Sequence, residues 1–191
     1  MNKTVKTILT AVIVVALVVA VAYAVFVVNG KPKTDLEPVT SAGDLEELVS
    51  KIYEGQGELY SRLMTQTIDV TDNDSVPYYT GLENGENLEY LVISEPMMMS
   101  QAYSLVLAKV KDGVDANVVA KEMSEKIDTR KWICVSAEKL YATSSGDVVF
   151  LIMTNEEMAT PVYEKFKTLA GNVNEVYEKT EEAVELPEDM Y

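Results

Sequence analysis

The most distinctive pattern in the chain is an unbroken apolar run near its N-terminus, residues 8–28 (ILTAVIVVALVVAVAYAVFVV). The run carries no charge, and as an α-helix it would extend for about 31 Å, the thickness of a bilayer core. In lipid every backbone amide must be bonded within the segment, so we predict a single transmembrane helix. Residues 1–7 form a short polar tail ahead of it.

A polar segment, residues 29–43 (NGKPKTDLEPVTSAG), follows the apolar run and is rich in proline and glycine. This composition predicts a linker. Ser41 and Asp44 then match a capping box, which predicts a helix start. The apolar positions that follow recur at helical spacing: Leu45, Leu48, Val49 and Ile52. We therefore expect an amphipathic helix that ends before Gly55.

Further apolar runs predict the strands of a folded domain. They are residues 67–70, 88–93, 103–110, an interrupted run over 132–135 and 137–143, and 148–153. The last (VVFLIM) has no polar position, which predicts a central strand covered by helix on at least one side. Asp115 is a good cap for one helix, and Thr160 with Pro161 predicts the start of another that ends at Gly171.

From Tyr103 onward the predicted order is β-α-β-β-α, at the centre of a domain that we place at residues 44–170. This order predicts an α+β fold with a mixed or antiparallel sheet and helices on one face, related to ferredoxin-like arrangements. Residues 171–191 are strongly acidic and carry a thin apolar stripe. We expect a fraying helix there that leads into a solvated acidic tail.

The amino-acid composition excludes several kinds of catalytic and metal site. The chain has no histidine, which removes the commonest general base and metal ligand and every Ser-His or Cys-His arrangement. Cys134 is the single cysteine, and its strand-like surroundings predict a small buried hydrophobe. We expect no catalytic residues, no cofactor and no metal ion.

Charge separates the two parts of the chain. All 31 acidic residues lie from Asp35 onward, whereas four of the 16 basic residues flank the apolar run. From Asp35 onward the chain has the remaining 12 basic residues and all 31 acidic ones, so this region has a net charge of −19. Such a charge disfavours nucleic acid and anionic lipid as partners and favours cations and basic proteins.

The flanking charges also predict the orientation of the apolar run. Lys3, Lys6 and the N-terminal amine lie on one side, and Lys31 and Lys33 lie on the other. A short tail ahead of a long polar domain is typical of a signal anchor, so we expect a single-pass protein of the cell membrane. Its N-terminus would be cytoplasmic and its domain extracytoplasmic. The alternative is signal-peptide cleavage near Ala24, which would release a secreted ligand-binding protein.

Part of the chain resembles a known family. The stretches YSLVLAKVKDGVD and RKWICVSAEKLYATSSGDVVFLIM are similar to an uncharacterised family of small membrane-anchored proteins and lipoproteins of Gram-positive bacteria. The similarity covers roughly Leu88 to Met153. The segments on which it rests are the turn at 111–113, residues 131–134 and the hairpin at Gly146. The family has no established activity, so the resemblance implies an envelope protein and no mechanism.

Asp69, Asp72 and Asp74 (IDVTDNDSV) form a candidate cation site, because hard cations prefer clustered carboxylates. The pattern departs from an EF-hand, since Val76 and Pro77 occupy positions where that loop needs a ligand and a glycine. A solvated acidic loop is the competing interpretation.

Two clusters are candidates for a partner surface. Met97, Met98 and Met99 have the thioethers that Cu(I) prefers, but three consecutive side chains point in different directions. An adaptable partner-binding edge is the better interpretation. Tyr78 and Tyr79 would supply flat rings with polar tips for a glycan or peptide, although β-propensity alone also explains strand tyrosines.

The functional prediction combines the anchor with a domain that has no evident catalytic residues. Ser144 or Ser145 with Lys139 would suggest a Ser-Lys pair, but the serines are explained by a hairpin turn. We expect a membrane-tethered extracytoplasmic binding or scaffolding module that contacts the bilayer through residues 8–28 and binds an envelope protein. The alternative is an envelope enzyme that uses carboxylates alone, which needs two carboxyls roughly 5–10 Å apart.

Overall fold

The structure is a computed structural model that describes residues 34–57, 60, 62–97 and 101–181. The predicted tail and transmembrane helix, Met98, Met99 and residues 182–191 lie outside these ranges. Within them, no helix combines the length and the apolar character that crossing a bilayer requires.

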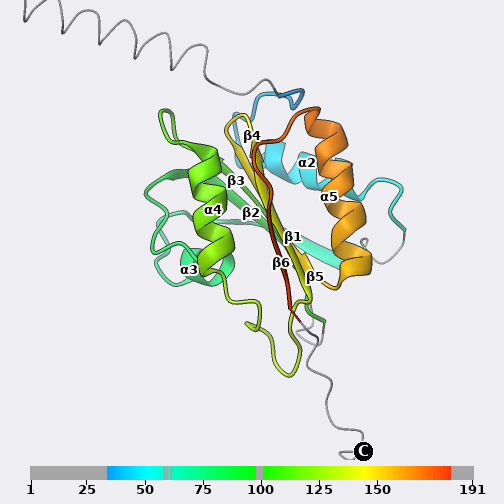
Figure 1. The fold of residues 1–191 in the computed structure, drawn as a ribbon. Coiled ribbons are helices and arrows are strands. Elements are labelled where there is room, and N and C mark those ends of the chain that lie inside the picture. The colour runs from blue at the N-terminus through cyan, green and yellow to red at the C-terminus, as the bar shows by residue number, and fades with distance from the viewer. Residues whose placement is uncertain (1–33, 58–59, 61, 98–100, 182–191) are drawn as a thin grey trace, which may run out of the picture. The chain divides into compact units, whose positions relative to one another are not determined.

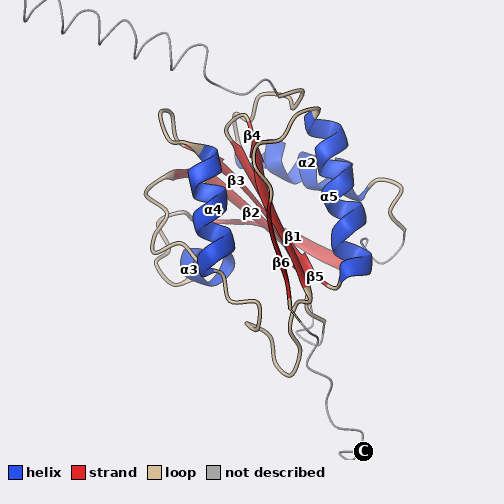
Figure 2. Ribbon diagram, in the orientation of Figure 1, coloured by secondary structure: helices blue, strands red, loops and turns tan. Residues whose placement is uncertain are grey.

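Six strands form one antiparallel sheet in the described part of the chain (Figures 1 and 2). In spatial order they are β1 (Leu63–Ile68), β2 (Leu88–Pro96), β3 (Ser104–Val110), β5 (Val148–Thr154), β4 (Lys139–Ser145) and β6 (Tyr177–Thr180). Every neighbouring pair is antiparallel, and β1 and β6 are the two edges. The prediction of an α+β domain with an antiparallel sheet is confirmed.

Helices cover both faces of this sheet, as Figure 1 shows. The helices α2 (Ala42–Tyr53) and α5 (Glu156–Ala170) pack on one face, and α3 (Ser75–Thr80) and α4 (Ala116–Lys126) pack on the other. Each face therefore has its own hydrophobic cluster. The prediction that the helices lie on one face is wrong.

The direction of the two strand crossovers explains this difference. The connections β3-α4-β4 and β5-α5-β6 each join two parallel strands that have one antiparallel strand between them. Both cross the sheet in the same direction but start from strands of opposite direction, so crossovers of one hand place their helices on opposite faces. In a ferredoxin-like sheet the second crossover would return toward β3. Here β6 pairs with β4, so only the predicted β-α-β-β-α order is confirmed.

The centre of the sheet is the predicted apolar strand. Every residue of β5 is buried, between β3 and β4 and beneath helices on both faces. Phe150 of β5 stacks on Phe166 of α5, with ring centroids 4.4 Å apart. An all-apolar strand is stable here because both of its faces are removed from water.

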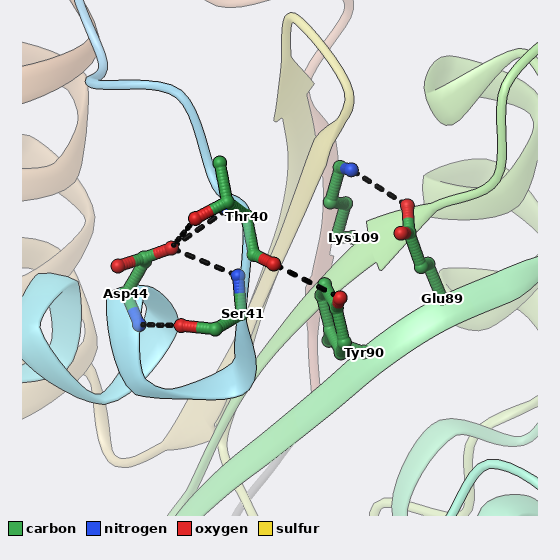
Figure 3. A network of polar contacts seen from close by, with 6 residues as sticks. All are labelled: Thr40, Ser41, Asp44, Glu89, Tyr90 and Lys109. Carbon is green, nitrogen blue, oxygen red and sulfur yellow. Dashed lines mark hydrogen bonds and ion pairs between the residues drawn. The ribbon is translucent and has the colours of Figure 1, made fainter.

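Helix α2 begins with the predicted capping box, drawn in Figure 3. The Ser41 hydroxyl accepts from the backbone N–H of Asp44 at 3.4 Å, and the Asp44 carboxylate accepts from the N–H groups of Thr40 and Ser41 at 2.7 and 2.8 Å. The Tyr90 hydroxyl of β2 donates to the Thr40 carbonyl at 3.0 Å. Val39 is buried, so the described end of the predicted linker packs on the domain.

Three predicted elements differ in position or type. Strand β1 begins at Leu63, not at residue 67, and β2 continues past Ile93 to Pro96. Residues 132–135 form a loop and no strand. Cys134 is exposed there with a φ of 63°, so its prediction as a buried hydrophobe is also wrong.

The two C-terminal predictions also need correction. Helix α5 begins at Glu156, because the Asn155 side chain accepts from the N–H of Met158 at 3.0 Å and caps the helix earlier. Pro161 consequently lies inside the helix. Residues 177–180 form β6 in place of a fraying helix, since β4 offers its open edge for pairing.

Candidate functional site

A pocket of about 200 Å³ lies where β1, the end of β2, α3 and the loop after α4 meet. We call it the aromatic pocket. Its lining consists of Met64, Gln66, Tyr78, Tyr79, Glu95, Pro96, Met97 and Trp132. Met64 lies opposite Glu95 in the β1-β2 register, and Met64 and Gln66 are two positions apart, so these side chains share one face of the sheet.

Lys131 lies against the wall of this pocket with only 3% of its side chain exposed. Its ammonium donates to Glu95 Oε1 at 2.7 Å and to the Ser104 hydroxyl at 3.2 Å. The Nζ atom also lies over three rings, 4.7 Å from the centroid of Tyr78, 4.9 Å from Tyr79 and 5.4 Å from Trp132. Lys131 therefore ties the loop after α4 to both α3 and β2.

The surroundings shift the ionisation of these groups. Burial lowers the pKa of Lys131, and the Glu95 carboxylate opposes that shift. Burial also raises the pKa of Tyr78 and of Tyr79. The pocket thus combines aromatic and thioether walls with an ion pair between Lys131 and Glu95, whose opposite charges cancel. Such a surface suits binding of an apolar or aromatic group that has a polar or basic end.

The rim of the pocket holds most of the exposed apolar side chains of the described residues. Five large hydrophobic side chains are exposed in these ranges: Met64 (46%), Tyr78 (39%), Met97 (80%), Val118 (59%) and Ile133 (69%). Three of them line the pocket, and Ile133 directly follows Trp132. Val118 lies on α4. Exposed apolar patches of this kind mark interaction sites.

The structure brings part of the predicted partner surface together. Tyr78 and Tyr79 of α3 lie edge-to-face, 4.9 Å between ring centroids, and share the pocket with Met97. Lys131, Trp132 and Glu95 were not predicted as site residues. The basic and aromatic residues of the sequence RKW (130–132) were a sequence feature that pointed to this site. Their proximity to Tyr78 and Glu95 depends on contacts between segments that are distant in the sequence.

The predicted cation site has a local structural role. Asp69 accepts from the N–H and hydroxyl of Thr71, both at 2.8 Å, and Asp72 accepts from the N–H groups of Asp74 and Ser75. These bonds lower the pKa of both carboxyls, and for Asp72 the Ser75 hydroxyl contributes most. They shape the turn before α3. Among the described residues there is no cluster of three His, Cys, Asp or Glu side chains suited to a metal ion.

The structure does not bring the Ser-Lys pair together. Lys139 begins β4 and the serines end it, about 16 Å away along an extended strand. Lys139 pairs with Glu178 of β6, and Ser144 accepts from the Asn174 amide at 2.8 Å. Lys139 and Ser144, which are both buried, therefore hold β4 to the C-terminal segment.

A second pocket of about 310 Å³ lies where the segment 35–39 crosses α2 and the end of α5. Three of its charged side chains already have partners on the protein. Asp44 belongs to the capping box, and Lys51 pairs with Glu47 at 2.8 Å on the surface of α2. This pocket lacks the aromatic walls and the buried ion pair of the first, so the aromatic pocket is the stronger candidate.

Comparison with the known protein families, the curated proteins and the solved structures found no match to this chain.

Proposed function

We propose that this protein is a membrane-tethered extracytoplasmic binding module and that the aromatic pocket with its exposed rim is its binding surface. The observation that supports this most is the concentration of exposed apolar side chains, Met64, Tyr78 and Met97, around one pocket. Contact between these apolar side chains and water is unfavourable, and a bound partner would remove them from water.

The ion pair beneath the pocket supports the same proposal. A buried ion pair contributes little net stability, because both charges lose their hydration. Lys131 and Glu95 do, however, set the positions of Tyr78, Tyr79 and Trp132 around one ammonium group. Such preorganised rings bind a partner at a lower entropic cost than mobile ones.

Site-specific photocrosslinking in intact cells tests the binding surface. A photoreactive phenylalanine analogue would replace Met97 in the full-length chain, and in a matched strain it would replace Val118, which is exposed on α4. We expect irradiation to produce a discrete adduct from position 97 and none from position 118. Identical adduct patterns, or none at either position, would count against a binding surface at the pocket.

Protease treatment of intact cells, or of spheroplasts where an outer membrane is present, tests the proposed orientation. An extracytoplasmic domain should be digested, and the fragment that remains should stay in the membrane fraction. Complete protection would contradict the orientation. A soluble chain beginning at Val25 would show that the protein is secreted after cleavage.

A further inference from the structure

We propose that the partner of this site is an extended basic segment of another protein, which pairs with the open edge of β1 and places alternate side chains at the aromatic pocket. The inference depends on the proposed binding function and names its partner class. It goes beyond that function because it assigns a backbone docking edge as well as a pocket.

Strand β1 has the properties of an edge that accepts another strand. In the described part of the chain it has a strand neighbour on one side only, and it pairs with β2 over six successive residues without a bulge. Its sequence, LMTQTI, contains no charge and no proline. Proteins usually protect an open edge with charges, prolines, bulges or very short strands. None of these devices is present along β1.

The opposite edge of the sheet shows the usual protection. Strand β6 has four residues, YEKT, two of which are charged. Glu178 of this strand is paired with Lys139 of β4. The contrast within one sheet indicates that the uncharged edge at β1 is a specific feature of that side.

The geometry connects the edge with the pocket. Met64 and Gln66 of β1 project to the face that carries the pocket. A strand added to β1 would lie about 4.8 Å away, and every second side chain would point to the same face. Those side chains would lie beside Met64 and Gln66, which line the pocket together with Tyr78 and Tyr79. Backbone pairing would then provide affinity, and the pocket would provide specificity.

Charge selects a basic segment over a second copy of this chain. On the face opposite the pocket, Glu46 accepts a hydrogen bond from Thr67 of β1 at 2.9 Å. A carboxylate therefore lies beside the edge on that face, whereas the charge of Glu95 on the pocket face is already balanced by Lys131. The whole chain has a formal charge of −15, so two copies repel each other while a basic segment is attracted.

Binding of defined peptides to the full-length chain in non-ionic detergent tests this inference. The panel is acetyl-KTXTKTXT-amide with Phe, Leu, Val or Tyr at both X positions, which places apolar and basic side chains on one strand face. Trp132 is the only tryptophan of the chain and lines the pocket, so its fluorescence reports occupancy. We expect saturable binding by at least one peptide and much weaker binding when both lysines are replaced by glutamate.

Two variants locate the binding surface. Met64→Lys should weaken binding about tenfold or more, because it removes an apolar contact at the edge and repels a basic peptide. Met97→Lys, at a more exposed position, should act in the same direction and serves if the first variant is poorly folded. Val118→Lys makes the same change on α4 and should leave the affinity within about twofold.

Backbone methylation separates strand pairing from simple pocket binding. Two versions of the best peptide carry N-methyl groups on alternate residues, in opposite phase. A peptide paired to β1 uses amides on one side only, so one version should lose binding and the other should retain it. If both versions bind like the parent, strand pairing is wrong while the binding module stands.

Two other results would overturn the inference. Absence of saturable binding by the whole panel at millimolar concentration would exclude a basic strand partner, and the photocrosslinking would still test the binding module independently. Dimerisation of the wild-type chain in sedimentation, lost in Met64→Lys and kept in Val118→Lys, would identify a second copy as the occupant of the edge.

Discussion

Replacement of Glu95 by glutamine should expose the energetic role of the buried ion pair at the pocket. Lys131 has 3% of its side chain exposed and Glu95 has 17%, and their charged atoms are 2.7 Å apart. Glu95→Gln keeps the size of the side chain and a hydrogen-bonding oxygen but removes the negative charge. The ammonium of Lys131 is then left in a buried position without its counter-ion.

The structure sets the expected magnitude. Removal of one partner of a fully buried ion pair costs about 3–5 kcal/mol. The partial exposure of Glu95 and the three rings that still surround the ammonium reduce this cost, because each cation–π contact contributes about 0.5–1 kcal/mol. We expect a loss of about 2–3 kcal/mol in the free energy of unfolding, or about 5–10 °C in melting temperature.

The loss should depend on pH in a defined direction. Burial lowers the pKa of Lys131 below its ordinary value of 10.5, so between these two values the unfolded chain binds more protons than the folded one. Stability therefore rises with pH across this window and is lost as pH falls through the folded pKa. Without Glu95 the pKa of Lys131 falls further. The loss in free energy of unfolding of Glu95→Gln, relative to the wild type, should consequently be largest near neutral pH and should shrink as pH approaches 10.5.

Urea denaturation of the full-length chain in detergent, followed by Trp132 fluorescence at about pH 7 and about pH 10, measures this loss. The control is the double variant Glu95→Gln with Lys131→Met, which removes both charges. It should lie within about 1 kcal/mol of the wild type, because no uncompensated charge remains. A single variant as stable as the wild type, or a double variant no better than the single one, would refute the reasoning.

Three further predictions concern the fold. Gly113→Ala should lower the free energy of unfolding by about 1 kcal/mol, because Gly113 has a positive φ of 85° but lies in open space. Gly81→Ala should lower it clearly more, since the new Cβ would lie 2.4 Å from the backbone nitrogen of Ile127. Equal losses for the two variants in urea denaturation would contradict this. Phe166→Ala should cost about 3–5 kcal/mol because its ring is fully buried, and a loss below about 1 kcal/mol would show that the core repacks. Cys134 is exposed and should react with a disulfide reagent in the folded protein as readily as in urea, whereas protection would contradict the loop conformation.

Local signals in the sequence predicted several elements well. The capping box at Ser41 placed the start of α2, Asp115 caps α4, and Gly171 follows the last residue of α5. These features depend on residues a few positions apart, so the sequence contains the whole interaction. The start of α5 was predicted wrongly because Asn155 and Thr160 are both good caps. The choice between them depends on the burial of Met158 and Ala159 against the sheet.

Local pattern also predicted that β5 is central, because a strand without a polar position must lie within the sheet and away from water. The sequence by itself thus determined the α+β class, the order of elements from β3 to α5 and the acidic character of the domain. It also provided Tyr78, Tyr79 and Met97 as surface candidates, without a reason to place them together.

Only the tertiary structure decided which faces the helices cover, that residues 177–180 extend the sheet, and how the pocket is assembled. The pairing of Met64 with Glu95 joins segments 31 positions apart, and Lys131 joins Glu95 across 36. The alternating pattern of a strand is the same whichever strand lies beside it, so it cannot specify neighbours. Those neighbours follow from packing free energy summed over the whole domain, and the pocket exists only where they meet.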